Sequence, residues 1–192
     1  MMASTALVLA ITACSESDDF TYPCIVTEMA DCASDAQGTI RRITLDDGRT
    51  YTLTNPLAGY AQNAVYRAMC GYTLEPSGSA TLYQTMGAYV LRDSADAPLH
   101  HPTNAESAWI TPRYINLHLR PKTYGGRQYW GYVTDSIKGG TAYLSIHHNQ
   151  CGDPLAYSTT VYASIPLDSI PTDSIHLSIH TFDGVKTWTF RK

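Results

Sequence analysis

Apolar and polar residues alternate along most of the chain after residue 20, and a period of two is typical of half-buried β-strands. In the first half the alternation recurs in six short segments, at 22–30, 38–45, 50–54, 66–74, 80–84 and 89–92. The sequence Asp-Asp-Gly at 46–48 separates two of them and predicts a tight hairpin, because glycine supplies the positive φ that primed turns need. A small closed or nearly closed β-barrel would hide the sheet edges that so many short strands create.

The second half has a cleaner alternation, in segments 114–120, 128–135, 141–148, 158–167, 174–182 and 185–191. Turn residues bound each segment, for example Lys-Gly-Gly at 138–140 and Asp-Gly at 183–184. Ile115, Leu117 and Leu119 share one face of the first segment, and polar residues occupy the opposite face. Several such strands in a row predict an antiparallel β-sandwich.

Between the two halves, residues 94–106 are rich in Pro, His and small polar residues. Such a composition indicates a linker, and its prolines favour an extended, semi-rigid chain. The pattern therefore predicts two all-β domains, at 21–93 and 107–192.

Composition agrees with this organisation and excludes several classes of protein. Charged residues make up 16% of the 192 residues, which is low for a helical bundle or a disordered chain. Three of the 17 acidic residues lie within the first 19 positions, so the remainder is close to neutral against 13 Lys and Arg. A nearly neutral body does not suit nucleic-acid binding, which needs a basic surface to neutralise phosphates.

The N-terminus has the features of an export signal. Residues 6–13 are apolar, too few to span a bilayer but suited to the core of a signal peptide. Ile11-Thr12-Ala13-Cys14 resembles the lipobox of bacterial lipoproteins, which implies cleavage after residue 13 and a membrane anchor of acyl chains on Cys14. The acidic segment that follows, within 14–20, resembles the export signal of surface lipoproteins in the Bacteroides group, so we expect lipid anchoring in the outer membrane and display on the cell surface.

Three motifs in the second half resemble the NigD-like lipoproteins of the Bacteroides group. They are Arg-Tyr-Ile-Asn-Leu at 113–117, His-Asn-x-x-Gly-Asp at 148–153 and Phe-Asp-Gly-x-Lys-Thr at 182–187. The resemblance implies an all-β chain with an N-terminal OB-like barrel and a C-terminal immunoglobulin-like antiparallel β-sandwich. It also matches Asn149, Gly152 and Asp153 to a structural turn motif of the family. The family has no settled activity, so the resemblance bears on architecture and location more than on function.

With Cys14 as the lipid acceptor, four cysteines remain in an exported chain, an even number that permits disulfides. We predict a possible disulfide between Cys24 and Cys70, because both lie on barrel strands and the first and fourth strands of an OB barrel are neighbours. Pairing of Cys32 with Cys151 would need a bridge between domains, and free thiols remain an alternative.

Aromatic residues provide the best candidate for a binding surface. Tyr124, Tyr129, Trp130 and Tyr132 surround a Gly-rich turn, and flat amphipathic rings suit sugars and protein partners. Of these, Tyr129, Trp130 and Tyr132 are the candidate ligand-binding residues. Packing within the sheet is the competing interpretation for Trp130. The seven histidines predict no metal site, because His176 and His180 are about 13 Å apart on an extended strand.

No catalytic motif is present: the sequence lacks a P-loop, a nucleophile elbow, a His-Glu-x-x-His segment and a Rossmann fingerprint. We therefore predict a non-enzymatic outer-membrane lipoprotein that needs no cofactor and binds a ligand or protein partner. A glycan-binding accessory protein is the first alternative, and a metal-dependent hydrolase is the second.

Overall fold

The computed structural model describes residues 23–94 and 98–192. The predicted signal peptide, the lipidation of Cys14 and the acidic tether lie outside these residues. Strands dominate the described chain, and the one short 3-10 turn is η1 (Leu167–Ser169). No helix in the described ranges is long and apolar enough to cross a membrane. The predicted all-β fold class is confirmed.

Five strands form the N-terminal barrel: β1 (Val26–Ser34), β2 (Ile40–Leu45), β3 (Thr50–Leu57), β4 (Val65–Leu74) and β5 (Ala80–Val90). Antiparallel pairs connect β1 to β2, β2 to β3, β4 to β5, and β4 to β1. A parallel contact of β3 with β5 then closes the ring at Leu53 and Ala80. This is a five-stranded, partly open Greek-key barrel of OB-like type. The predicted hairpin at 46–48 joins β2 to β3, and Gly48 has a φ of 89° there.

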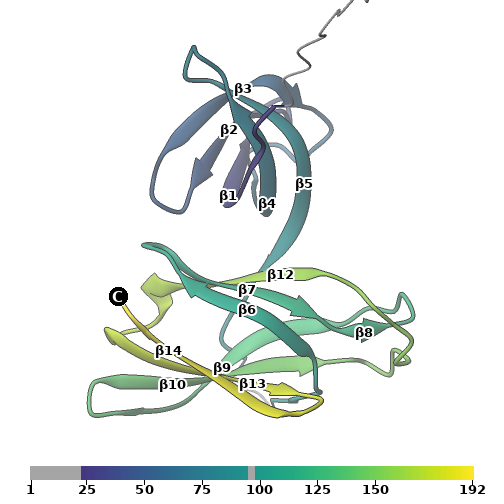
Figure 1. The fold of residues 1–192 in the computed structure, drawn as a ribbon, viewed down its shortest axis with the longest axis vertical. Coiled ribbons are helices and arrows are strands. Elements are labelled where there is room, and N and C mark those ends of the chain that lie inside the picture. Colours follow the sequence, from purple (N-terminus) through teal and green to yellow (C-terminus); the bar gives the residue numbers. More distant parts are fainter. Residues whose placement is uncertain (1–22, 95–97) are drawn as a thin grey trace, which may run out of the picture.

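The C-terminal half is a sandwich of two sheets (Figure 1). One sheet contains β6 (Asn104–Ile110), β7 (Tyr114–Arg120) and β12 (Val161–Pro166), and the other contains β9 (Tyr129–Lys138), β10 (Thr141–Asn149), β13 (Ser174–Thr181) and β14 (Gly184–Arg191). A short pair, β8 (Lys122–Thr123) with β11 (Tyr157–Ser158), lies at one end. The sandwich is not wholly antiparallel, because β10 runs parallel to β13.

The alternation in sequence places the predicted side chains in the core between the two sheets. Ile115, Leu117 and Leu119 on β7 are fully buried, as are Ile175 and Leu177 on β13. A second, separate core fills the barrel around Ile43, Leu45 and Tyr72. Each half therefore has its own hydrophobic core, as independent folding units do.

Strand β5 joins the two halves into one sheet, which the alternation did not predict. The segments expected at 80–84 and 89–92 are parts of a single strand, whose first part pairs with β4 and whose last residues, 88–90, pair with β12. Figure 1 shows this strand running from the barrel into the sandwich. The pattern was ambiguous because residues 83–87 are exposed on both faces of the strand.

The predicted linker is also part of the sandwich where the structure describes it. Asp93 forms a bridge with Tyr132 on β9, and His100 forms one with His148 on β10. The backbone NH of Thr103 donates to the carbonyl of His180, and strand β6 begins at Asn104, inside the segment that composition assigned to the linker. Prolines and histidines do not alternate, so this backbone pairing gave no signal in the sequence.

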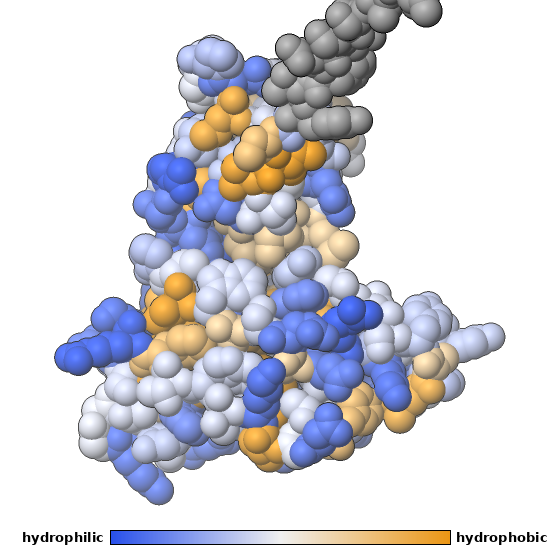
Figure 2. All heavy atoms as spheres, viewed as in Figure 1, coloured by the Kyte–Doolittle hydropathy of each residue, from blue (hydrophilic) through white to orange (hydrophobic). Residues whose placement is uncertain are grey.

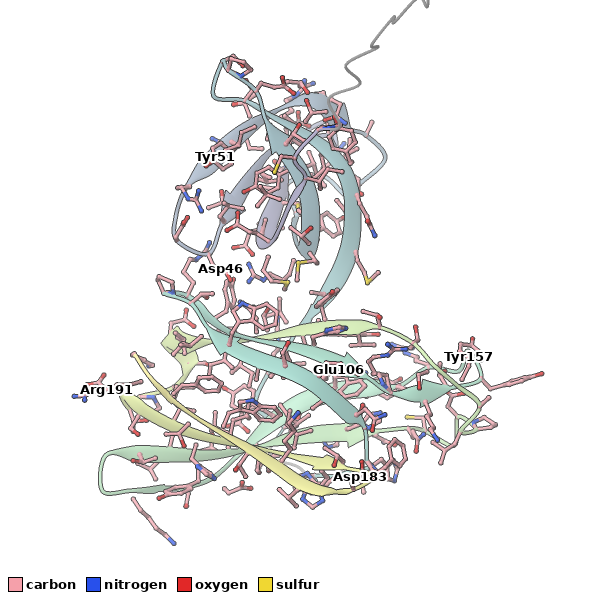
Figure 3. All side chains as sticks on the ribbon, viewed as in Figure 1. Asp46, Tyr51, Glu106, Tyr157, Asp183 and Arg191 are labelled. Atoms are coloured by element: carbon pink, nitrogen blue, oxygen red, sulfur yellow. The ribbon has the colours of Figure 1, made fainter. Side chains whose placement is uncertain are left out.

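A buried polar cluster fastens the barrel to the sandwich. Arg67 on β4, with a side chain 1% exposed, lies between Asp31 and Asp46 of the barrel. Its Nη1 is 3.1 Å from Oδ1 of Asp31 and 2.6 Å from Oδ1 of Asp46. From the sandwich, Asn116 accepts a hydrogen bond from Nη2 of Arg67 at 3.0 Å, and Ser164 accepts one from Nε at 3.1 Å. We name Arg67, Asp31, Asp46, Asn116 and Ser164 the junction cluster; Figure 3 shows Asp46 between the two halves.

The first family motif supplies the sandwich side of this junction. The ring of Tyr114 lies under the guanidinium of Arg67, 3.9 Å from the ring centroid to Cζ. Arg113 contacts Asp31 with Nη2 2.7 Å from Oδ2. Asn116, on the predicted polar face of β7, is completely buried because the barrel covers that face. The motif therefore docks one domain on the other.

Candidate partner-binding surface at the sandwich tip

One end of the sandwich carries a group of exposed aromatic side chains. We name it the tip: the β8–β9 connection with its flanking residues, 122–129, and the β10–β11 connection with β11, 150–158. Tyr124 is 74% exposed, Tyr157 56% and Tyr129 46%. Figure 3 shows Tyr157 at this far end of the sandwich, away from the barrel. Leu155 adds a further exposed apolar group.

The carboxylate of Asp153 organises the tip. Its Oδ1 accepts hydrogen bonds from the backbone NH groups of Tyr124 at 2.9 Å and Gly126 at 3.1 Å. Its Oδ2 accepts from the hydroxyl of Thr123 and from Nε2 of Gln128 at 2.7 Å. One nearly buried carboxylate thus holds four donors of the β8–β9 connection in place.

These hydrogen bonds favour the ionised form of Asp153. The Thr123 hydroxyl contributes most, with the NH groups of Tyr124 and Gly126 and the Gln128 amide, and together they lower the pKa of the carboxyl to about 2. Gly126 permits the close approach, since a Cβ there would lie 2.7 Å from Cγ of Asp153. Gly152 has a φ of 76°, so the turn leading into Asp153 uses a conformation that favours glycine. The motif Asn149, Gly152 and Asp153 therefore lies in a turn that fixes the tip.

Gln128 connects this carboxylate to the interior of the sandwich. Its Oε1 is 2.9 Å from Nε2 of His148, and Nδ1 of His148 is 2.9 Å from the carbonyl oxygen of His101. The His148 ring stacks on Trp130, with centroids 3.9 Å apart. Burial lowers the pKa of His148 to about 4. The loop that carries the exposed tyrosines is therefore connected to the sandwich interior through Asp153, Gln128, His148 and Trp130.

The structure separates the three aromatic residues that the sequence grouped. Tyr129 is exposed, Trp130 is half-buried against His148, and Tyr132 is only 3% exposed, with its hydroxyl donating to Ser169 Oγ at 2.9 Å. Tyr132 lies in the core and Trp130 supports the tip, so the predicted set is corrected to Tyr129 joined by Tyr124 and Tyr157. Tyr157 was missed because its neighbours do not alternate, whereas Tyr124 was recognised beside the Gly-rich turn but left out of the candidate set.

The charges on the tip are basic. The guanidinium of Arg127 lies over the ring of Tyr129, 4.8 Å from its centroid, and the ammonium of Lys122 lies 5.1 Å from that of Phe182. Among the described residues, neither cation forms an ion pair. Asp153 is already engaged by its four donors, so the charge that the tip presents to solvent is positive.

The cysteines are arranged differently from the predicted pairing. Cys70 is buried in the barrel with its Sγ 3.7 Å from Sγ of Cys32, whereas Cys24 is exposed before β1. The register explains the correction: Val26 pairs with Tyr72, so Cys24 continues toward Leu74, about 13 Å along the strand from Cys70. All four cysteines of the described residues are thiols in this structure, and Cys151 is exposed on the tip.

Several histidines lie together near the ends of β10 and β13. The rings of His100 and His180 stack at 5.0 Å, and Nδ1 of His147 accepts the backbone NH of Leu99 at 2.8 Å. Within 23–94 and 98–192, no group of three His, Cys, Asp or Glu side chains is arranged to hold a metal ion. The contacts of these histidines are ring stacking and hydrogen bonds to the backbone.

Comparison with known proteins identifies the fold. No family model matches the sequence, and no curated protein matches it. A NigD-like immunity protein from Bacteroides caccae superposes with a TM-score of 0.69 at 23% identity, covering 88% of this chain and 93% of that one. A protein of unknown function from Bacteroides vulgatus gives a TM-score of 0.70 at 16% identity, with coverage of 88% and 90%. A structure assigned as a lipoprotein from Bacteroides fragilis gives 0.64 at 12% identity, with coverage of 88% and 98%. The predicted resemblance to NigD-like proteins is confirmed at the level of the fold.

Proposed function

We propose that this chain is a lipid-anchored, surface-exposed outer-membrane protein of NigD-like type, without catalytic activity, that binds a protein partner through the tip. The observation that carries the proposal is the set of three exposed tyrosines held on a support organised by Asp153. Tyrosine and arginine are enriched where proteins bind each other, and a rigid loop loses little conformational entropy on binding. The lipobox at Cys14 supports lipid anchoring, and one fold neighbour is described as a lipoprotein.

A protein partner suits the tip better than a glycan. The tip projects from the end of the sandwich, and its tyrosines, glycines and Arg127 have the composition of a protein-binding loop set. The basic groups of the tip favour a partner with an acidic surface.

Photo-crosslinking tests the binding surface in intact cells. We expect benzoylphenylalanine in place of Tyr157 or Tyr124 to give a discrete protein adduct on irradiation, identified by mass spectrometry. Tyr83 on β5 is the matched control, because it is a tyrosine of similar exposure, 53%, on the barrel. Equal adducts from Tyr83, or none from the tip, would contradict the proposal. Adducts that carry only carbohydrate would favour the glycan alternative.

The anchor is tested separately. We expect Cys14→Ala to abolish incorporation of radiolabelled palmitate and to release the chain from the membrane fraction, because the acylated thiol is then missing. Ser15→Ala is the control and should remain labelled. Protease treatment of intact cells should degrade the anchored wild type, whereas protection of the chain would place it on the periplasmic side of the membrane.

A further inference from the structure

A cavity of about 610 Å³ opens in the wall of the barrel, beside the junction with the sandwich. Its volume lies within the range of small-molecule sites, which is about 300–1,000 Å³. Figure 2 shows apolar residues, in orange, on the barrel and along the narrow region above the sandwich. The side chains that line the cavity come from the barrel core, the β3–β4 connection, β5 and the start of β12; the main ones are Ile40, Leu57, Tyr60, Tyr66, Tyr89 and Val161.

The strand topology creates this opening. Strands β3 and β5 share one backbone pairing, at Leu53 and Ala80. Next to it the side chain of Asn55 replaces a strand partner, donating to the carbonyl of Leu82 at 2.7 Å and accepting its NH at 2.9 Å. Beyond Leu82, β5 stays paired with β4 as far as Gly87 and then pairs with β12, while β3 makes no further backbone pairing with it, so the wall between β3 and β5 stays open.

Small residues leave the space and aromatic residues shape it. Ala68, Gly87 and Ala88 lie in the lining, and a Cβ built on Gly87 meets no atom within 4 Å. Tyr60 and Tyr66 pack edge to face at 4.9 Å, and the Tyr66 hydroxyl accepts the NH of Ala61 at 2.9 Å. The walls are therefore fixed in position rather than collapsed into the cavity.

The charge of the lining decides the class of ligand. Arg67 is its one charged residue, and the junction cluster already engages this guanidinium, whose side chain is 1% exposed. Three side chains at the opening are exposed to solvent: Val65 by 68%, Tyr89 by 49% and Val90 by 46%. Hydration of this apolar surface is unfavourable, so its burial by a ligand would be favourable. A charged ligand would lose its hydration here without gaining a partner, whereas an apolar one would bury this surface.

We propose that this cavity binds an uncharged, mainly apolar small molecule, with the hydroxyl groups of Tyr89, Thr85 and Thr160 available for one polar end. The site is distinct from the tip, because none of the residues 122–129 and 150–158 lines the cavity. The inference stands on the lining and on the strand topology, so it does not depend on the proposed partner.

Two dyes with the same anilinonaphthalene ring system test the site on the folded mature chain. N-phenyl-1-naphthylamine is uncharged, and 1-anilinonaphthalene-8-sulfonate adds one sulfonate. We expect saturable fluorescence enhancement by the uncharged dye, with one dye bound per chain and at least tenfold tighter binding than the sulfonate. Equal affinity for the two dyes, no saturation, or one dye per two chains would overturn the proposal.

Substitutions locate the bound dye. Gly87→Leu should fill the cavity and weaken binding of the uncharged dye at least tenfold, and Gln84→Leu, on the same strand but outside the lining, should leave it unchanged. Tyr89→Ala removes an exposed wall and should weaken binding about threefold or more, which provides a second variant if Gly87→Leu lowers the unfolding midpoint. Unchanged binding in Tyr89→Ala and in folded Gly87→Leu would place the dye elsewhere and overturn the assignment.

Discussion

Replacing Arg67 with methionine is expected to lower the free energy of unfolding by about 3–5 kcal/mol, because it leaves Asp46 buried without a cation and Asp31 paired with Arg113 alone. Urea denaturation measures this loss. All three tryptophans, Trp109, Trp130 and Trp188, lie in the sandwich, and Trp109 also lines a pocket together with barrel residues, so their fluorescence reports the sandwich and the junction. Because the junction cluster joins the halves, we expect the fluorescence transition to separate from the circular dichroism transition in Arg67→Met.

Arg41→Met is the matched control for this prediction. Arg41 pairs with Asp35 on the surface, where its side chain is 59% exposed, and such pairs contribute about 0–1 kcal/mol. A loss in Arg67→Met as small as that in Arg41→Met would show that the junction cluster does not stabilise the fold. Adding Asp46→Leu to Arg67→Met should recover part of the loss, since the uncompensated carboxylate is then removed.

Asp153→Asn is expected to release the tip while the sandwich stays folded. Asparagine offers the four donors one acceptor oxygen in place of two, and an amide nitrogen in place of Oδ2 would face the Nε2 donor of Gln128. The backbone NH groups of Tyr124 and Gly126 should lose at least tenfold in hydrogen-exchange protection at pH 7. Crosslinking from Tyr157 should fall in parallel, because the tyrosines no longer hold one arrangement.

The pH dependence of the tip has a definite sign. The pKa of Asp153 is lowered to about 2 by its hydrogen bonds, so its stabilisation is complete above pH 4 and is lost as the pH falls toward 2. The NMR shifts of the Tyr124 and Gly126 amides should titrate with that midpoint in the wild type and not in Asp153→Asn. Asp183→Asn, on an exposed turn, should leave the exchange and the titration unchanged. A midpoint near 4 in the wild type would show that the four donors do not hold the carboxylate.

Most strands could be predicted because one face of each is buried in a local core. The segment 114–120 coincides with β7, and 141–148 falls one residue short of β10. Strand β6 and the single long β5 could not be predicted, because their side chains do not alternate between core and solvent. Their pairing depends on backbone hydrogen bonds to distant strands, which leave no mark in local composition.

Prediction of the candidate site was less complete. The Gly-rich turn directed attention to the right loop, and the family motif identified Asp153. Alternation places Tyr129 on one face of the strand and Trp130 and Tyr132 on the other, but the sequence did not show which face the rest of the protein covers. Tyr157 joins the tip because β11 pairs with β8, across more than thirty positions of sequence.

The amino-acid sequence alone showed that the chain is all-β and that its alternating segments fall into two groups, one for each domain. It also showed that residues 115, 117 and 119 face a core. A period of two fixes which side chains share a face, and burial of apolar groups then selects that face for the interior. Tertiary structure decided what covers the other face. Asn116 lies on the predicted polar side of β7 yet is fully buried, because the barrel brings Arg67 against it. Pairing between distant strands also determines that β5 belongs to both halves and that a cavity lies beside it. It likewise brings three tyrosines together at the tip.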